Sequence, residues 1–160
     1  MSKKFEKKVT IQNMASPGDC VVIATSKRQA GKVLVARKSG KISWLNIRDG
    51  NEVEIDGYHN QTVGEISDMA VDDVGTIYVT DTNMIYTFNF NGSFKFLFKV
   101  KDSPKCISAS GEGNLYVLSG SKDSGDIIKI FNGNNGKRDY YDIKCPTDVN
   151  FVTTGLYSSK

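Results

Sequence analysis

The chain has 160 residues, of which 24% are charged and 39% hydrophobic, and its formal net charge is +3. This length is sufficient for one domain with its own core. So small a net charge does not by itself indicate nucleic-acid binding. No apolar run approaches the roughly 20 residues that a membrane-spanning helix needs.

The N-terminal residues MSKKFEKK are charged and lack an apolar core, so we expect no secretory signal peptide. The three cysteines, Cys20, Cys106 and Cys145, form no CxxC pair, and the chain has a single histidine. Reduced thiols are therefore expected rather than a disulfide framework or a zinc site. The composition predicts a cytoplasmic protein that carries no cofactor and no metal.

The first predicted elements form an isolated strand and a first four-stranded unit. Residues 7–11 alternate in polarity and predict a lone strand within the segment 5–12, which would belong to a preceding unit. Within residues 15–57 we predict strands at 20–25, 32–36, 41–47 and 51–55. A polar connection that contains the only histidine, His59, follows.

Residues 67–100 are the clearest stretch of the sequence. Four short runs alternate in polarity and are rich in β-branched and aromatic residues. Turn signals at 72–75, 81–83 and 91–92 separate them. Asn91-Gly92 favours a two-residue hairpin loop of type I′, which needs positive φ at both positions. A four-stranded antiparallel meander is therefore predicted over 64–100.

The pattern repeats 38 residues later. The matching pairs are Gly75 with Gly113, Ile77 with Leu115, Tyr78 with Tyr116, and Val79 with Val117. This spacing is the size of one β-propeller blade. In the third unit, 104–143, we predict strands at 106–110, 114–118, 127–131 and 140–143, with a long polar loop over 119–126. An inner strand at 149–153 would begin a partial fourth unit over 146–160.

No segment has the sustained apolar spacing of an α-helix. The predicted fold class is therefore all-β, a partial β-propeller of four-stranded antiparallel blades that forms a single segment over residues 1–160. Because propellers close with about four to eight blades, three blades leave blade faces and strand edges unpaired. We therefore expect one of two alternatives: these residues are a fragment of a longer product, or the chain completes the propeller by self-association with another copy.

Residues 75–94 resemble the NHL repeat of β-propellers. The matching residues are Gly75, Ile77, Tyr78, Val79, Asp81, Asn83, Ile85, Phe88, Asn91, Gly92 and Phe94. The third unit matches in part, through Pro104, Gly113, Leu115, Tyr116, Val117, Ile130, Phe131 and Gly136. It departs at Ser119, where the family has an aspartate, and the second unit departs at Met84, where a basic residue is usual. The first unit matches poorly.

The resemblance implies a recognition domain. NHL propellers commonly form the substrate-recruiting domain of tripartite-motif ubiquitin ligases, where they bind proteins or structured RNA. The resemblance therefore implies a non-catalytic scaffold for protein–protein interaction, in a ubiquitin-ligase context. These 160 residues contain no RING, B-box or coiled-coil region, so we assign no ligase activity to them.

One face of such a propeller carries the loops from outer to next inner strand and from second to third strand. The candidate partner-binding residues on this face are Lys38, Lys41, Asp81, Asn83, Lys101, Lys105, Lys122 and Lys144. Their six lysines favour RNA as an alternative partner. The segment 20–48 also contains basic residues and no acidic residue. Its residues Lys27 and Arg28, however, are expected at the opposite end of the strands from Lys38 and Lys41. No RNP-type aromatic motif accompanies them.

Several acidic residues have a structural and a functional interpretation. Asp81 and Asn83, and the segment Asp123 to Asp126, are predicted to cap turns rather than ligate a cation. Asp19, Asp68 and Asp148 lie near the starts of inner strands. In the third alternative function, a metal-dependent, lactonase-like hydrolase, these aspartates would hold the metal. In the structural interpretation they accept hydrogen bonds from backbone groups at the strand entry. We predict the structural role and no catalytic residue. We also predict that Cys20 and Cys106 are buried and that Trp44, Tyr78, Tyr116 and Phe88 pack between blades.

Overall fold

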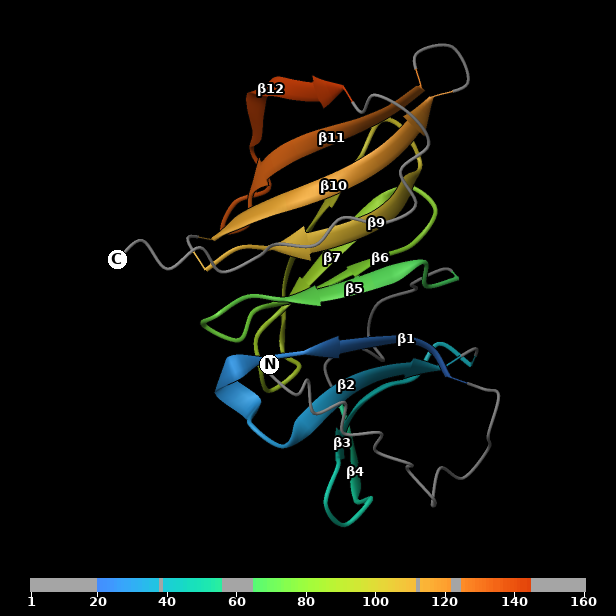
Figure 1. Ribbon diagram of the computed structural model, residues 1–160, viewed down its shortest axis with the longest axis vertical. Coiled ribbons are helices and arrows are strands. Elements are labelled where there is room, and N and C mark those ends of the chain that lie inside the picture. Colours follow the sequence, from blue (N-terminus) through green and yellow to red (C-terminus); the bar gives the residue numbers. More distant parts are fainter. Residues whose placement is uncertain (1–19, 38, 56–64, 112, 122–124, 145–160) are drawn as a thin grey trace, which may run out of the picture.

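The computed structural model describes residues 20–37, 39–55, 65–111, 113–121 and 125–144. Within these ranges it places every side chain except those of Cys20, Val21, Ser121, Asp139, Tyr140 and Tyr141. Three four-stranded antiparallel sheets are stacked one on another (Figure 1). The predicted fold class, a partial propeller of four-stranded blades, is confirmed.

In each blade the strands pair in chain order. Blade one contains β1 (Cys20–Thr25), β2 (Lys32–Arg37), β3 (Ile42–Asn46) and β4 (Glu52–Glu54). Blade two contains β5 (Asp68–Val71), β6 (Ile77–Thr80), β7 (Met84–Phe88) and β8 (Phe94–Lys99). Blade three contains β9 (Pro104–Ala109), β10 (Asn114–Ser121), β11 (Gly125–Asn132) and β12 (Arg138–Lys144). The predicted strands at 7–11 and 149–153 lie outside the described residues.

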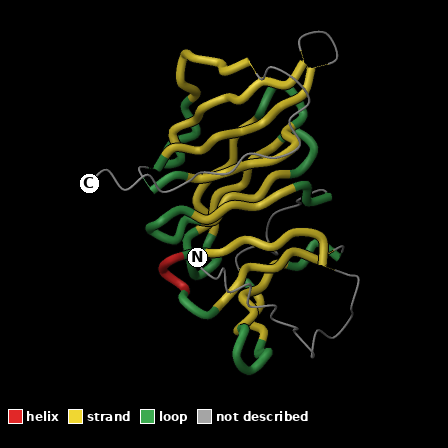
Figure 2. Tube along the Cα trace, in the orientation of Figure 1, coloured by secondary structure: helices red, strands yellow, loops and turns green. Residues whose placement is uncertain are grey.

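The described residues contain one helical turn that the sequence did not predict, the 3-10 helix η1 (Lys27–Gln29), coloured red in Figure 2. The Ser26 hydroxyl caps it by accepting a hydrogen bond from the backbone N–H of Arg28 at 3.2 Å. A turn of three residues is too short to show helical periodicity, so the sequence pattern could not reveal it.

Blade two lies between the other two blades, and its inner strand β5 contacts both β1 and β9 (Figure 1). Because successive side chains of a strand point to opposite faces, blade two contributes to two cores. Val79 and Phe88 pack with Leu34 and Trp44 of blade one. Tyr78 packs with residues of blade three in the second core. The predicted packing roles of Trp44, Tyr78 and Phe88 are confirmed, and Cys106 is buried as expected.

A common register relates all three blades, including blade one, whose sequence fits the repeat poorly. Gly31, Gly75 and Gly113 have φ values of +82°, +91° and +81° at the turn before the second strand. The fourth residue after each glycine is a fully buried valine: Val35, Val79 and Val117. The turn and the core position therefore recur in blade one even where the intervening residues differ.

The predicted type I′ turn at Asn91-Gly92 is wrong. Among the described residues no residue other than glycine has a positive φ, and only Gly92 of this pair adopts one, at +88°. The loop is longer than two residues, and Gly92 N–H donates to the carbonyl of Asn89 at 2.8 Å. The Asn91 side chain instead accepts a hydrogen bond from the backbone N–H of Ser93 at 3.1 Å. This asparagine therefore stabilises the turn through its side chain and not through a left-handed backbone.

The long polar loop predicted at 119–126 is also wrong in part. β10 and β11 continue as a paired hairpin, with Ser119 opposite Ile127 and Ser121 opposite Gly125. Lys105 and Asp126 form an ion pair of 2.6 Å beside this extension. Main-chain hydrogen bonds maintain a strand ladder whatever the side chains are, so a polar sequence at the end of a hairpin conceals it.

Hydrogen bonds also join the blades. The Asp68 carboxylate of blade two accepts from the backbone N–H of Met69 and from that of Ile107 in blade three, both at 2.8 Å. The predicted structural role of Asp68 is thus confirmed, whereas Asp19 and Asp148 lie outside the described residues. Trp44 of blade one donates its indole N–H to the carbonyl of Phe90 in blade two at 3.2 Å.

We expect Gly92→Ala to destabilise the protein more than Gly31→Ala does. Both positions have positive φ, which costs an alanine about 1–2 kcal/mol. A Cβ at Gly92 would in addition overlap Cγ2 of Ile55 across the blade interface, whereas a Cβ at Gly31 meets nothing. Overpacking of this kind costs about 1–3 kcal/mol more. Urea unfolding of the two variants measures the difference, and equal losses would contradict the described contact.

Candidate functional site

The predicted partner-binding face is formed by the loops that follow β2, β6, β8 and β10. The antiparallel order places these loops, the start of β9 and the end of β12 at one end of the sheets. Six of the predicted partner-binding residues adjoin these strand ends: Lys41, Asp81, Asn83, Lys101, Lys105 and Lys144. Lys38 and Lys122 lie outside the described residues. A main-chain bond of 2.8 Å from Val100 N–H to the carbonyl of Asn83 joins two of the loops.

Asp81 is a turn-capping residue at this face, as predicted. Its carboxylate accepts from the backbone N–H groups of Asn83 at 3.1 Å and Met84 at 2.9 Å. It also accepts from the phenol of Tyr86 at 3.0 Å. Burial, and secondly the bond to Asp81, raise the pKa of Tyr86 to about 12. The buried Asp81 carboxylate therefore serves the turn, whereas Asn83 is exposed.

Two of the lysines on this face form ion pairs with carboxylates. Lys41 pairs with Glu54 at 3.3 Å, and Lys105 pairs with Asp126 at 2.6 Å. Lys101 and Lys144 are exposed. Two of the four described lysines of this face thus stand beside carboxylates.

The basic stretch at 20–48 does not form a continuous positive surface either. Folding brings acidic residues from elsewhere in the chain to its cations. Lys27 pairs with Asp73 of blade two at 3.0 Å, and Arg37 pairs with Glu52 at 2.6 Å. Arg28 donates to the carbonyl of Val74 at 2.6 Å and stacks over the ring of Phe90. Acidic residues from outside the stretch thus pair with three of its basic residues, Lys27, Arg37 and Lys41.

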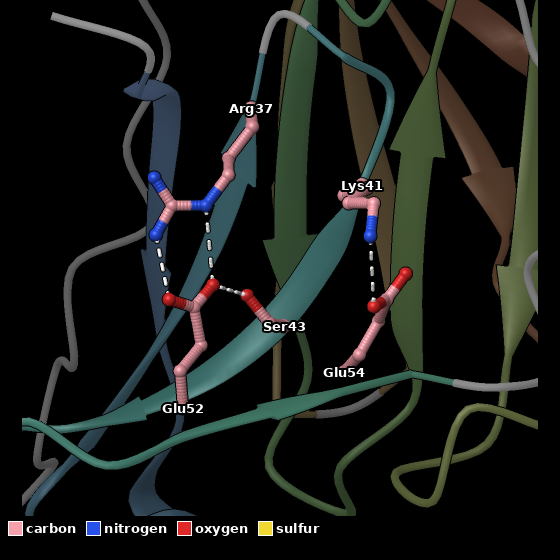
Figure 3. Close-up of a pocket in the computed structure, with 5 residues that line it drawn as sticks. All are labelled: Arg37, Lys41, Ser43, Glu52 and Glu54. Atoms are coloured by element: carbon pink, nitrogen blue, oxygen red, sulfur yellow. Dashed lines mark hydrogen bonds and ion pairs between the residues drawn. The ribbon is translucent and has the colours of Figure 1, made fainter. Parts of the chain in front are cut away.

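A pocket of about 300 Å³ opens on blade one beside Lys41 (Figure 3). Its lining residues come from β2, β3, β4 and the loop before β3: Arg37, Lys41, Ser43, Glu52 and Glu54. Figure 3 shows Arg37 and Ser43 directed at the carboxylate of Glu52, and Lys41 directed at Glu54. Arg37 donates from Nε at 3.2 Å and from Nη2 at 2.6 Å, and the Ser43 hydroxyl donates to the same carboxylate.

Four of these five residues are not predicted from the sequence. The fifth, Lys41, is predicted from its loop position alone. Glu52 and Glu54 alternate along a short outer strand, and Ser43 faces them from β3, with Ser43 opposite Glu54 in the register. The sequence signal for this site is the spacing of Glu52 and Glu54, which places both acids on one face of a strand. This spacing indicates a site only when the register of that strand with β3 is known.

Two carboxyl groups have shifted pKa values in opposite directions. The hydrogen bond from Arg37 holds the pKa of Glu52 below its usual 4.5, and the bond from Ser43 adds to this effect while burial opposes it. Burial raises the pKa of Asp68 above its usual 3.8, although the hydrogen bonds from Ile107 and Met69 counteract it. The fold therefore stabilises the ionised form of Glu52, whereas burial disfavours the ionised form of Asp68.

Among the residues that the structure describes, no group of three or more His, Cys, Asp or Glu side chains is placed to hold a metal ion. Within the same ranges no helix has the length and apolar character to cross a membrane.

No protein-family model matches the chain, and no curated protein matches its sequence. Solved structures do match. A chain of the nidogen/laminin complex has a TM-score of 0.63 at 20% identity, over 75% of this chain and 46% of that one. A chain of the hydrazine synthase of Kuenenia stuttgartiensis has a TM-score of 0.65 at 15% identity, over 83% of this chain and 38% of that one. This chain thus spans less than half of either, and the likeness shows the fold alone.

We expect the stability contributed by Glu52 to disappear in acid. Its pKa in the folded protein lies below 4.5. The ionised carboxylate therefore stabilises the fold above pH 4.5, and this contribution is lost as the pH falls through the folded pKa. Melting temperatures of the wild type and Glu52→Gln should differ most near pH 6 and converge as the pH falls below the folded pKa of Glu52. Glu65→Gln, at an exposed position outside the cluster, is the control, and a pH-independent difference for Glu52→Gln would contradict the assignment.

Proposed function

We propose that this chain is a non-catalytic scaffold that binds another protein through the face carrying Lys41, Lys101, Lys105 and Lys144. The observation that supports a protein partner is the mixture of charges on this face. Lys41 and Lys105 stand beside Glu54 and Asp126. Alternating charges complement a protein surface, whereas a nucleic-acid backbone requires continuous positive potential.

The structural neighbours are compatible with this proposal and do not decide it. One matching chain comes from a complex of two proteins, nidogen and laminin, and another comes from an enzyme, hydrazine synthase. The NHL-like pattern of blade two is the reason to propose that the scaffold recruits a substrate for a ubiquitin ligase. RNA binding through the exposed Lys101 and Lys144 is the alternative.

Self-association is a further part of the proposal. The register places Ile23 on the side of β1 that faces away from blade two, and Ile143 on the corresponding side of blade three. Their exposed fractions are 56% and 49%. A second copy that joins these faces would complete a ring, and light scattering would give a dimer mass. A monomer at all concentrations would exclude this part.

The proposed face predicts that Lys101→Glu/Lys144→Glu abolishes capture of the protein partner. The measurement is affinity purification from an extract of the source organism, with and without ribonuclease. Lys32→Glu/Lys95→Glu is the matched control, because it makes the same charge change at two exposed lysines at the opposite end of the strands. The wild type and the control should retain the partner after ribonuclease treatment.

Two outcomes would contradict this proposal. Retention that is equal in both double variants would place the interface elsewhere. Retention that ribonuclease abolishes, and that falls steeply between 50 and 200 mM salt as expected when about 6–10 phosphates are contacted, would instead identify RNA as the partner.

A further inference from the structure

The common register defines one equivalent position in the third strand of every blade. The buried valine of the second strand pairs with this residue: Val35 with Ser43, Val79 with Tyr86, and Val117 with Lys129. In blades two and three this residue lies on the face that packs against the preceding blade. Tyr86 belongs to the core shared with blade one, and Lys129 reaches Asp102 in the loop that follows blade two.

Blades two and three fill this position with a long side chain whose polar end meets a carboxylate. Tyr86 is 6% exposed and donates its phenol proton to Asp81. Lys129 is 3% exposed and its ammonium pairs with Asp102. In both blades the stem occupies space between sheets and the tip satisfies an acidic group.

Blade one has carboxylates beside this position, contributed by β4, and lacks the long side chain. Ser43 is 2% exposed, and its short hydroxyl only reaches Glu52. Arg37 stands two residues after Val35, as Asp81 stands two residues after Val79. The position that supplies a carboxylate in blade two is therefore a cation in blade one, and this cation binds the carboxylate of Glu52. The space that Tyr86 fills in blade two corresponds in blade one to the pocket of about 300 Å³.

We propose that this pocket binds a phenol group, the chemistry of a tyrosine side chain, whose hydroxyl donates its one proton to a carboxylate of the pocket, that of Glu52 or that of Glu54. The pocket already contains two cations and two anions in ion pairs. A neutral donor leaves this balance intact, whereas an ammonium or a carboxylate would add an unpaired charge.

The walls of the pocket also suit an aromatic ring. The guanidinium of Arg37 is planar, largely buried and held by two bonds to Glu52, so it forms a fixed wall of the pocket. The aliphatic stems of Lys41 and Glu54 supply apolar contact. The volume of about 300 Å³ is at the lower end of the range for ligand pockets, about 300–1,000 Å³, and so suits a single ring rather than a large cofactor.

The test compares two small probes that differ by one hydroxyl. Isotope-labelled protein is titrated with N-acetyl-tyrosinamide and with N-acetyl-phenylalaninamide while amide chemical shifts are recorded. The tyrosine probe should shift the amides of Ser43, Glu52 and Glu54 and bind about tenfold tighter, since one hydrogen bond to a charged group is worth about that factor. Equal affinity for the two probes, or shifts confined to other residues, would overturn the proposal.

A variant that fills the pocket from within the chain provides the second arm. Ser43→Tyr introduces the residue of blade two and should abolish binding of the tyrosine probe. Ser93→Tyr makes the same substitution at an exposed turn and should leave binding unchanged. Ser43→Leu fills the same space if Ser43→Tyr does not fold. Retained binding in a folded, filled variant would overturn the proposal, and the comparison of probes on the wild type needs no variant.

The same titration separates two sources of the phenol. A pentapeptide, Ala-Ala-Tyr-Ala-Ala, represents a tyrosine presented by a protein partner, and the amide probe represents a free small phenol. Tighter binding of the pentapeptide supports a partner's tyrosine, and preference for the amide supports a small molecule. Ser43 lies on the same face of blade one as Ile23, so a second copy that completed the ring would cover the pocket. The titrations therefore use protein that light scattering shows to be monomeric, and they test the pocket whether or not the lysine-bearing face binds a protein.

Discussion

Burial of blade two on both faces is the constraint on which the other features depend. All four residues of β6, from Ile77 to Thr80, are buried. Alternate side chains enter different cores, Ile77 and Val79 toward blade one and Tyr78 toward blade three. Burying a side chain of this size stabilises a fold by about 1.5–3 kcal/mol. Both neighbouring blades are therefore needed for the middle sheet to remove its apolar surface from water.

Stacking of this kind also requires that the polar groups at the strand ends be satisfied. Asp72 is buried and accepts hydrogen bonds from the backbone N–H groups of Val74 and Thr76. It also accepts from the phenol of Tyr78, which packs against blade three. Asp68 connects its own strand to Ile107. The same aspartates thus form the turns and fix the distance between sheets, which couples local structure to the packing of the blades.

The strands of blade two could be predicted from sequence because they are short, alternate in character and end at turn residues. The predictions that were wrong concern segments in which the residue types do not determine the backbone conformation. Asn91 has a residue type that permits positive φ, yet its side chain bonds to the backbone of Ser93 instead. The segment 119–126 is polar, yet the main chain of β10 stays paired with β11 as far as Ser121 opposite Gly125.

The candidate site was less predictable because it depends on register between strands. Lys41 was identified from its place in a loop, but its partner Glu54 comes from a different strand. The pocket exists because Ser43 occupies the position of Tyr86, and this equivalence appears only when the glycine turns of the three blades are superimposed. Lys27 and Arg37 of the basic segment at 20–48 pair with Asp73 and Glu52, and no local sequence pattern associates these acids with the segment.

The central claim is that the three blades form one cooperative unit because blade two is covered on both sides. Native-state hydrogen exchange in low concentrations of denaturant tests this claim most directly, because it reports the opening free energy of each strand. The claim predicts that the amides of β2, β6 and β10 exchange with the same opening free energy. Opening of β2 or β10 at a clearly lower free energy than β6 would show that the outer blades unfold separately, and it would contradict the account.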